Sequence, residues 1–230
     1  MTAVASIVEG DGEVAALPVL LRRLAQWRGA TDYVNVLTPI RVYKDRFLNR
    51  PEEFSRHLKL AAAKCGDAGW ILILFDADDD CPAEKGTAVL TQARAIIPHR
   101  RVAVVLANRE YEAWFIAAAE SLNGCRGFQC QASDSVVDPE VPRNAKGWVR
   151  ERMPAGYGET TDQPAFSAQF DLELAHQRSR SFRKLCSEWD KNLLGIEHFR
   201  HPLRVGTAGR PVTTVANNVD IFGSAHDETP

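Results

Sequence analysis

Apolar residues in the first half of the chain follow two alternating patterns. Short, nearly continuous apolar runs are typical of strands buried in a sheet. Such runs lie within residues 4–9, 34–42, 69–80 and 101–108. Between them, apolar positions recur every three or four residues or follow helix-start signals, which predicts helices. These helices are expected at residues 13–27, 51–65, 82–97 and 109–122. The alternation predicts an α/β fold with a parallel sheet flanked by helices.

Two prolines disturb this pattern. Pro18 lies inside the first predicted helix and is expected to kink it or to mark where its regular part begins. Pro39 lies inside the second predicted strand, so that strand should lie at an edge of the sheet or be broken there.

The second half of the chain contains no clear strand pattern. Residues 123–140 look irregular, and short helices are expected at 143–153, 171–177 and 181–194. The last residues are polar and contain glycine, which favours partial disorder. We therefore expect three parts: an α/β domain at 1–122, a helical extension packed on the sheet at 123–205, and a tail at 206–230.

Acidic residues follow three of the predicted strands. Glu9 closes the first strand, the segment 76–80 (DADDD) closes the most apolar one, and Glu110 and Glu112 follow the last. The carboxyl ends of parallel strands meet at one edge of a sheet, where ligands bind in such folds. Carboxylates gathered there repel one another unless a cation offsets the repulsion. Because Mg²⁺ prefers hard oxygen ligands, the pattern predicts a divalent-metal site.

Simpler explanations exist for some of these acids. Asp11 could cap the first helix or interact with its dipole, and Asp79 and Asp80 could cap the helix that begins near Pro82. Glu112 could be an ordinary acid in the first turn of a helix.

Glu9, Asp76 and Asp78 are harder to explain in this way. Each follows a very apolar strand, where an uncompensated charge is costly. Asp76 and Asp78 are two residues apart, so in an extended chain their side chains would point the same way and form a chelating pair.

The motifs IVEG (7–10) and LFDADDD (74–80) resemble the two signature motifs of the Toprim domain. Topoisomerases, bacterial primases, recombination-repair proteins and the overcoming-lysogenization-defect nucleases share this domain. The resemblance implies that Glu9, Asp76 and Asp78 are catalytic and bind Mg²⁺ or Mn²⁺ for phosphodiester chemistry.

Longer motifs resemble an uncharacterised bacterial Toprim-like family related to these nucleases. They are VEGDGE, FDADDD, ANREYEAWFIA and RSRSFRKL, and they span about residues 4–190. The resemblance implies a role in antiviral defence and a separate ATPase subunit as partner. The chain departs from the Toprim pattern because no glycine follows the aspartates before Gly86. It also contains no G-x-x-x-x-G-K-[ST] motif of its own.

The expected function is that of a metal-dependent nuclease, a hydrolase that cleaves DNA or RNA. Two metal ions could stabilise the attacking and leaving oxygens. The candidate metal ligands are Glu9, Glu13, Asp76, Asp78, Asp80, Glu110 and Glu112. The candidate substrate-binding residues are Arg109, Arg178, Arg180 and Lys184, although Lys184 could equally lie on a solvated helix face. Trp114, Phe115 and Phe182 are expected in the core, and Ser179 and Ser181 are expected to cap a helix.

Two other functions fit the same sequence. The chain could be a non-catalytic regulatory or effector subunit of an ATPase complex. It could also be a receiver-type or phosphatase-like domain, which needs an acid pair after the first strand; Glu9 followed by Gly10 fits that poorly.

Composition adds little to this choice. The 230 residues carry a formal net charge of −2, which neither indicates nor excludes nucleic-acid binding. Five scattered cysteines are typical of free thiols in a reducing compartment. No signal-peptide pattern and no apolar run of about 20 residues occurs, so we expect a cytoplasmic protein without a membrane segment.

Overall fold

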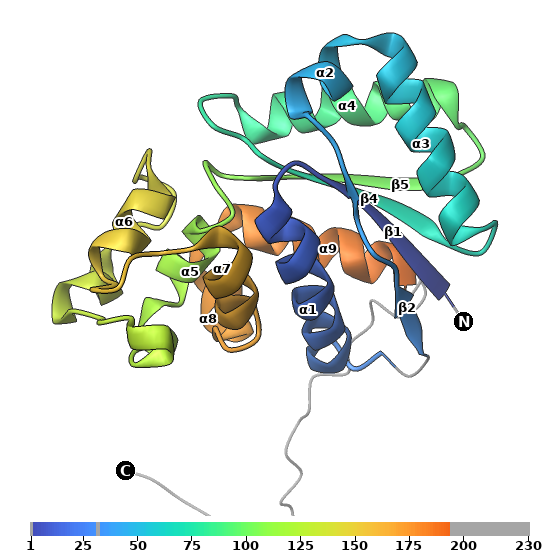
Figure 1. The fold of residues 1–230 in the computed structure, drawn as a ribbon. Helices are drawn as coiled ribbons and strands as arrows, with labels where there is room; N and C mark the ends of the chain where they lie inside the picture. Colours follow the sequence, from blue (N-terminus) through green and yellow to red (C-terminus); the bar gives the residue numbers. More distant parts are fainter. Residues whose placement is uncertain (1, 31–32, 194–230) are drawn as a thin grey trace, which may run out of the picture. The chain divides into compact units, whose positions relative to one another are not determined.

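A parallel sheet of five strands forms the centre of the protein (Figure 1). The strands are β1 (Thr2–Val8), β2 (Val34–Val36), β3 (Ile40–Arg41), β4 (Trp70–Asp76) and β5 (Arg101–Ala107). Their order is β2-β1-β4-β5, and β3 pairs with the last residues of β1. This computed structural model describes residues 2–30 and 33–193, so the predicted tail at 206–230 lies outside the described residues.

Helices cover both faces of the sheet. The helices of the first half are α1 (Asp11–Trp27), α2 (Lys44–Asn49), α3 (Pro51–Cys65) and α4 (Pro82–Ile96). The helices that follow β5 are α5 (Ala113–Ala117), α6 (Ala145–Glu151), α7 (Glu159–Ser167), α8 (Leu172–Arg178) and α9 (Arg180–Leu193). Figure 1 shows α2, α3 and α4 on one face and α1 and α9 on the other. The predicted class, an α/β fold with a parallel sheet, flanking helices and a C-terminal helical extension, is confirmed, and the layout is consistent with a Toprim-like domain.

The apolar runs are explained by two cores, one on each face of the sheet. Along β4, Ile71, Ile73 and Phe75 pack into the core beneath α2, α3 and α4. The alternate residues of β4, Leu72 and Leu74 among them, pack into the core shared with α1 and α9. A strand buried on both faces needs apolar residues at every position, as its sequence has.

The two prolines act differently. Pro39 lies in the gap between β2 and β3, so the second predicted strand is broken there and β2 forms an edge of the sheet. Pro18 lies inside α1, which runs without interruption from Asp11 to Trp27. The N-cap of α1 is Gly10, so Asp11 does not cap this helix. Asp11 lies in the first turn of α1, where the alternative explanation, an interaction with the helix dipole, places it, and it forms an ion pair with Arg41.

The helices that follow β5 pack on the sheet through aromatic contacts. Phe182 on α9 is fully buried and lies edge-on to Trp114, with 5.4 Å between ring centroids. Trp114 and Phe115 are buried as predicted. Ser179 caps α9 by accepting a hydrogen bond from the Phe182 backbone N–H at 3.2 Å. The helix α7 was not predicted, because Pro164 and its polar neighbours give no helical pattern.

No helix within residues 2–30 and 33–193 is both long enough and apolar enough to span a membrane.

A candidate metal centre at the carboxyl edge of the sheet

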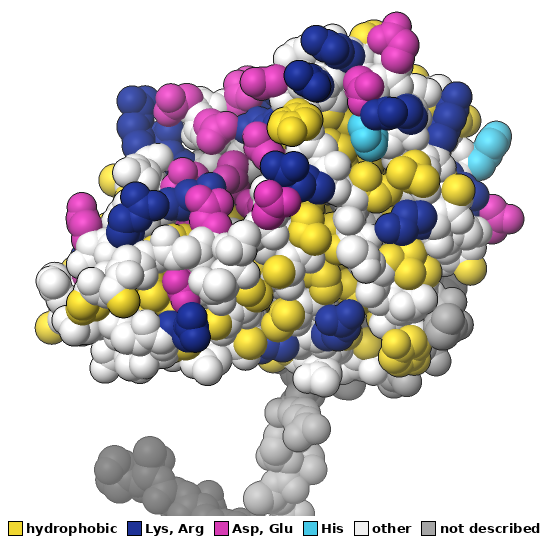
Figure 2. All heavy atoms as spheres, in the orientation of Figure 1, with side chains coloured by type: hydrophobic (Ala, Val, Ile, Leu, Met, Phe, Trp, Pro, Cys, Tyr) yellow, Lys and Arg dark blue, Asp and Glu magenta, His cyan; other side chains and the backbone are white. Residues whose placement is uncertain are grey.

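The predicted gathering of acids at one edge of the sheet is present. The strands β1 and β4 are neighbours, and their register pairs Ile7 with Ile73. Glu9 and Asp76 therefore leave adjacent strands at nearly the same height. Figure 2 shows Asp and Glu side chains interspersed with Lys and Arg on the surface around the start of α1.

Three carboxylates form the inner part of this cluster. Glu13 on α1 and Glu112 just before α5 are buried, and Asp76 at the end of β4 is 13% exposed. Asp76 Oδ1 accepts a hydrogen bond from the Tyr111 backbone N–H at 2.8 Å. Glu112 Oε1 accepts hydrogen bonds from the Tyr157 hydroxyl at 2.9 Å and from Gln163 Nε2 at 3.2 Å. We call Glu13, Asp76 and Glu112 the inner acids.

Several acceptor oxygens around the inner acids have no donor among the described residues. They are Glu13 Oε2, Glu112 Oε2 and Gln163 Oε1, all fully buried. A buried polar atom without a partner costs free energy, so each such atom requires an explanation.

The motif EGDGE provides space for two of these oxygens. A Cβ atom added at Gly10 would clash with Glu13 Oε2, and one added at Gly12 would clash with Gln163 Oε1. The two glycines therefore keep side chains away from the acceptor oxygens.

Burial and mutual repulsion shift the pKa values of these acids upward. Burial, reinforced by Glu112 and Glu13, raises the pKa of Asp76 well above its ordinary value. Burial also raises the pKa of Glu112 to about 7, although Lys146 and the Tyr157 hydroxyl oppose this shift. The pKa of Glu9 is raised by burial and by Asp78 and Glu13, while Lys44 opposes the rise.

Two lysines that the sequence analysis did not select lie among the acids. Lys146 Nζ on α6 is 3.9 Å from Asp76 Oδ2 and 3.4 Å from Glu159 Oε2. Lys44 on α2 donates to the Asp76 backbone carbonyl at 2.8 Å and forms an ion pair with Asp78. In the sequence both resemble ordinary surface lysines, so only their contacts in the fold identify them.

Asp78 does not form the extended pair with Asp76 that the spacing predicted. The strand β4 ends at Asp76, and Asp78 has a φ of 50°, in the left-handed region. The Asp78 side chain is 65% exposed, whereas that of Asp76 is 13% exposed. The turn after β4 therefore separates the two carboxylates, and of the two only Asp76 lies with the inner acids.

The remaining predicted ligands are engaged elsewhere. Asp80 forms an ion pair with Lys85 at 3.4 Å, and Glu110 accepts a hydrogen bond from the Lys146 backbone N–H at 2.8 Å. Neither Asp79 nor Asp80 caps α4, whose N-cap is Cys81, so that alternative explanation is wrong. Within the part of the chain that the structure describes, no three His, Cys, Asp or Glu residues form a ready-made metal site.

The predicted substrate-binding residues differ in how available they are. Arg178 donates to the carbonyl oxygens of Ala117 and Val137, so it holds the extension together. Arg109 donates to Asp79 Oδ1 at 2.8 Å. Arg180 pairs with Glu140 and Lys184 pairs with Glu188, yet both basic side chains remain largely exposed.

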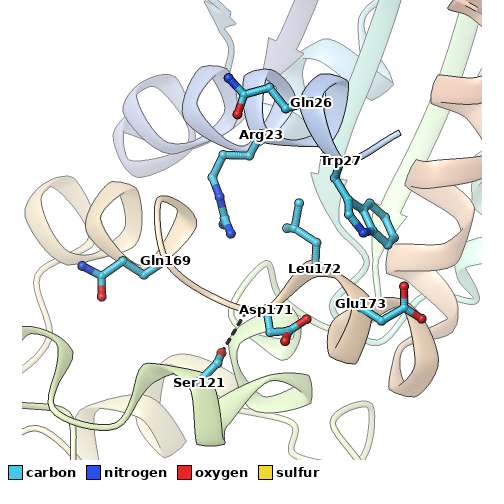
Figure 3. Close-up of a pocket in the computed structure, with 8 residues that line it drawn as sticks. All are labelled: Arg23, Gln26, Trp27, Ser121, Gln169, Asp171, Leu172 and Glu173. Carbon is cyan, nitrogen blue, oxygen red and sulfur yellow. Dashed lines mark hydrogen bonds between the residues drawn. The ribbon is translucent and has the colours of Figure 1, made fainter. Parts of the chain in front are cut away.

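A polar hollow of about 580 Å³ lies apart from these acids, where α1 approaches the start of α8 (Figure 3). Arg23 points into the space between them and donates to the carbonyl oxygens of Ser167 and Phe170, each at 2.8 Å. This arginine therefore joins the extension to α1 and is not free to bind an anion.

Comparison with known proteins gives one match. No curated protein and no solved structure matches the chain. The model of a family described as a domain of unknown function, DUF4276, matches residues 8–189. The match begins at the end of β1 and ends within α9, so it includes both the acidic cluster and the helices that complete it. The chain therefore belongs to the DUF4276 family.

Proposed function

We propose that this protein is a divalent-metal-dependent nuclease that hydrolyses phosphodiester bonds in DNA or RNA. One observation carries the proposal: two of the inner acids, Glu13 and Glu112, are buried, and the oxygens Glu13 Oε2, Glu112 Oε2 and Gln163 Oε1 have no donor among the described residues. The resemblance of IVEG and LFDADDD to Toprim motifs supports the same chemistry.

The residues present suit Mg²⁺ or Mn²⁺. Carboxylate and amide oxygens are the hard ligands that these ions prefer, and the glycines at 10 and 12 leave space beside two of them. Glu13, Asp76 and Glu112 would hold the ion, with Glu9 and Asp78 next to it. Since no ready-made site exists among the described residues, binding requires side chains to reorient. The bound ion would neutralise charge on the phosphate oxygens and lower the pKa of a water molecule.

The protein's own residues would orient these groups. The Tyr111 backbone N–H fixes Asp76, and Tyr157 and Gln163 fix Glu112. Glu9 is exposed and its pKa is raised above the ordinary value, so this carboxylate could accept a proton from the attacking water. Lys44 and Lys146 supply positive charge where a phosphate would approach.

One observation favours the alternative, a non-catalytic subunit of an ATPase complex. Lys44 neutralises Asp78 and Lys146 lies beside Asp76, so two acids already have cationic partners. An acidic cluster neutralised in this way can serve a purely structural role. The ATPase partner and the defence role rest on the sequence resemblance alone.

The decisive experiment measures cleavage of labelled single-stranded and duplex DNA and of RNA in Mg²⁺ or Mn²⁺. The test variants are Glu13→Gln and Asp76→Asn, and the matched control is Asp67→Asn, a fully exposed acid. We expect each test variant to lose about 10- to 100-fold in rate, as changes to groups that hold or orient a metal ligand typically do, and the control to cut normally. Calorimetric titration with Mn²⁺ runs in parallel. If the wild-type protein neither cleaves nucleic acid nor binds Mn²⁺, the nuclease proposal is rejected and the non-catalytic subunit is favoured.

A further inference from the structure

A second hollow lies along the free edge of the sheet. The strand β5 is the last in the order β2-β1-β4-β5, with β4 as its neighbour, and the hollow runs beside it between α4 and α9. Its volume is about 540 Å³, within the range of about 300–1,000 Å³ usual for small-ligand sites.

The wall of this hollow is mainly apolar. Val104 and Leu106 of β5 and Pro82 and Leu90 of α4 line it. Gly86 also lies on the wall, and a Cβ atom placed there would meet no other atom within 4 Å, so open space faces this turn of α4. Such a wall suits the flat, weakly polar face of an aromatic ring system.

Positive charge lines the side of the hollow formed by α9. The side chains of Arg180 and Lys184 line it and are 80% and 52% exposed. The nearby acid Glu140 is already engaged, since it accepts hydrogen bonds from Arg180, Ser181 and Asn108. Arg180 bonds to Glu140 through Nε, which leaves its planar guanidinium able to stack on a ring.

The hollow adjoins the candidate metal centre. Asn108, which lines it, directly follows β5, and Cys81 and Pro82, which also line it, end the turn that begins at Asp76. Backbone hydrogen bonds from Ala77 and Asp78 to the carbonyls of Ala107 and Arg109 hold this turn against the end of β5. A chain of nucleotides bound at the acids could therefore place a neighbouring base in the hollow.

We propose that this hollow binds one unpaired base of the nucleic-acid substrate, which makes the substrate single-stranded next to the bond that is cut. This inference rests on the proposed nuclease function. A base inside a duplex has both faces stacked and its edge paired, so it must leave the helix to enter such a hollow. Single strands present their bases without that cost.

Two other hollows within the described part of the chain do not fit this role. In the hollow of Figure 3, Arg23 already donates hydrogen bonds to two backbone carbonyl oxygens. The hollow of about 420 Å³ beside residues 135–140 contains Arg178 and Arg183, which donate to backbone carbonyls of the extension. The hollow beside β5 joins an apolar wall to exposed, basic side chains.

The test measures binding by fluorescence anisotropy in EDTA, so that no cleavage is needed. The probes are fluorescein-labelled dT15, a 15-base-pair blunt duplex, and a 15-mer with the same backbone and no bases. We expect dT15 to bind about tenfold more tightly than either other probe, the scale of losing one or two stacked bases. Equal binding of dT15 and the base-free probe, or of dT15 and the duplex, would overturn the proposal.

A matched pair of variants on α4 locates the site. Gly86→Phe fills the hollow, whereas Thr91→Phe places the same ring on an exposed part of the helix. We expect Gly86→Phe to weaken dT15 binding about tenfold and Thr91→Phe to change it less than about twofold. Unchanged binding by a folded Gly86→Phe protein, checked by its melting temperature, contradicts the proposal. Because binding is measured without metal, loss of base binding with cleavage intact rejects the hollow alone, and base binding without cleavage rejects the nuclease.

Discussion

Glu112 and Glu140 are both buried glutamates in this fold, but their surroundings differ. Glu140 accepts hydrogen bonds from the backbone N–H groups of Arg180 and Ser181 and from the side chains of Asn108, Ser179 and Arg180. Burial alone would raise its pKa, but these hydrogen bonds lower it below the ordinary value. Glu112 accepts two hydrogen bonds through one oxygen, its other oxygen has no donor among the described residues, and its pKa is raised to about 7.

The comparison separates a structural acid from a candidate functional one. A carboxylate whose oxygens are all satisfied stabilises the chain around it, here the start of α9 and the end of β5. A buried carboxylate left partly unsatisfied weakens the fold unless a ligand or a proton compensates it. Perturbed acids of this kind occur preferentially at functional sites.

The largest effect is expected from removing the structural acid. Glu140→Ala leaves Arg180 and Asn108 and two backbone N–H groups without their shared acceptor. We expect the free energy of unfolding to fall by about 3–5 kcal/mol, because each buried donor left without an acceptor costs roughly 1–3 kcal/mol. Urea unfolding measures it, with the exposed Glu151→Ala as control, expected within about 0.5 kcal/mol of wild type. A loss for Glu140→Ala no larger than that of the control would refute its structural role.

Glu112 should make the folded protein less stable as the pH rises. Its pKa is about 7 in the folded protein and near 4.5 in the unfolded chain, so the folded state binds more protons between these values. Stability should therefore fall by on the order of 3 kcal/mol as the pH rises from about 4.5 to about 7 in EDTA.

Glu112→Gln should remove this part of the pH dependence. Urea unfolding at a series of pH values compares the variant with wild type. Identical pH profiles for the two proteins would show that Glu112 is not the group responsible.

A smaller effect is expected at the glycines beside the inner acids. Gly12→Ala would push its Cβ against Gln163 Oε1 and close to the Glu159 backbone carbonyl. We expect a loss of about 1–3 kcal/mol in the free energy of unfolding, the usual cost of overpacking. Thermal unfolding measures it.

The matched control should change the free energy of unfolding in the opposite direction. Gly86→Ala lies in α4 facing open space, so it should stabilise the protein by about 0.5–1 kcal/mol through helix propensity. Equal effects of the two glycine substitutions would mean that the space at Gly12 is not tightly defined.

The strands and their acidic edge could be predicted because apolar periodicity depends on local sequence and parallel strands end at the same edge of a sheet. The strand order was not predicted. Glu9 and Asp76 needed only parallel topology to be placed together. The position of Asp78 could not be predicted, because its left-handed backbone removes it from the extended pattern. The roles of Lys146, Tyr157 and Gln163 also escaped prediction, since contacts between distant segments leave no periodic signal.

The helix α7 shows why such contacts were missed. It begins after Gly158 and contains Pro164, so its sequence resembles a loop. Its stability comes from packing along α1 and from the hydrogen bond between Gln163 and Glu112, and tertiary packing of this kind overrides local propensity.

The contacts of Tyr157 and Gln163 also determine when the acidic cluster is complete during synthesis. A ribosome-bound chain that ends before residue 157 already carries Glu9, Glu13, Asp76 and Glu112. It lacks the hydroxyl and amide that orient Glu112, and it lacks the helix that encloses Glu13. Domains fold as units once enough chain has emerged. A nascent or prematurely terminated polypeptide therefore carries the full acidic motif without the assembled acidic cluster.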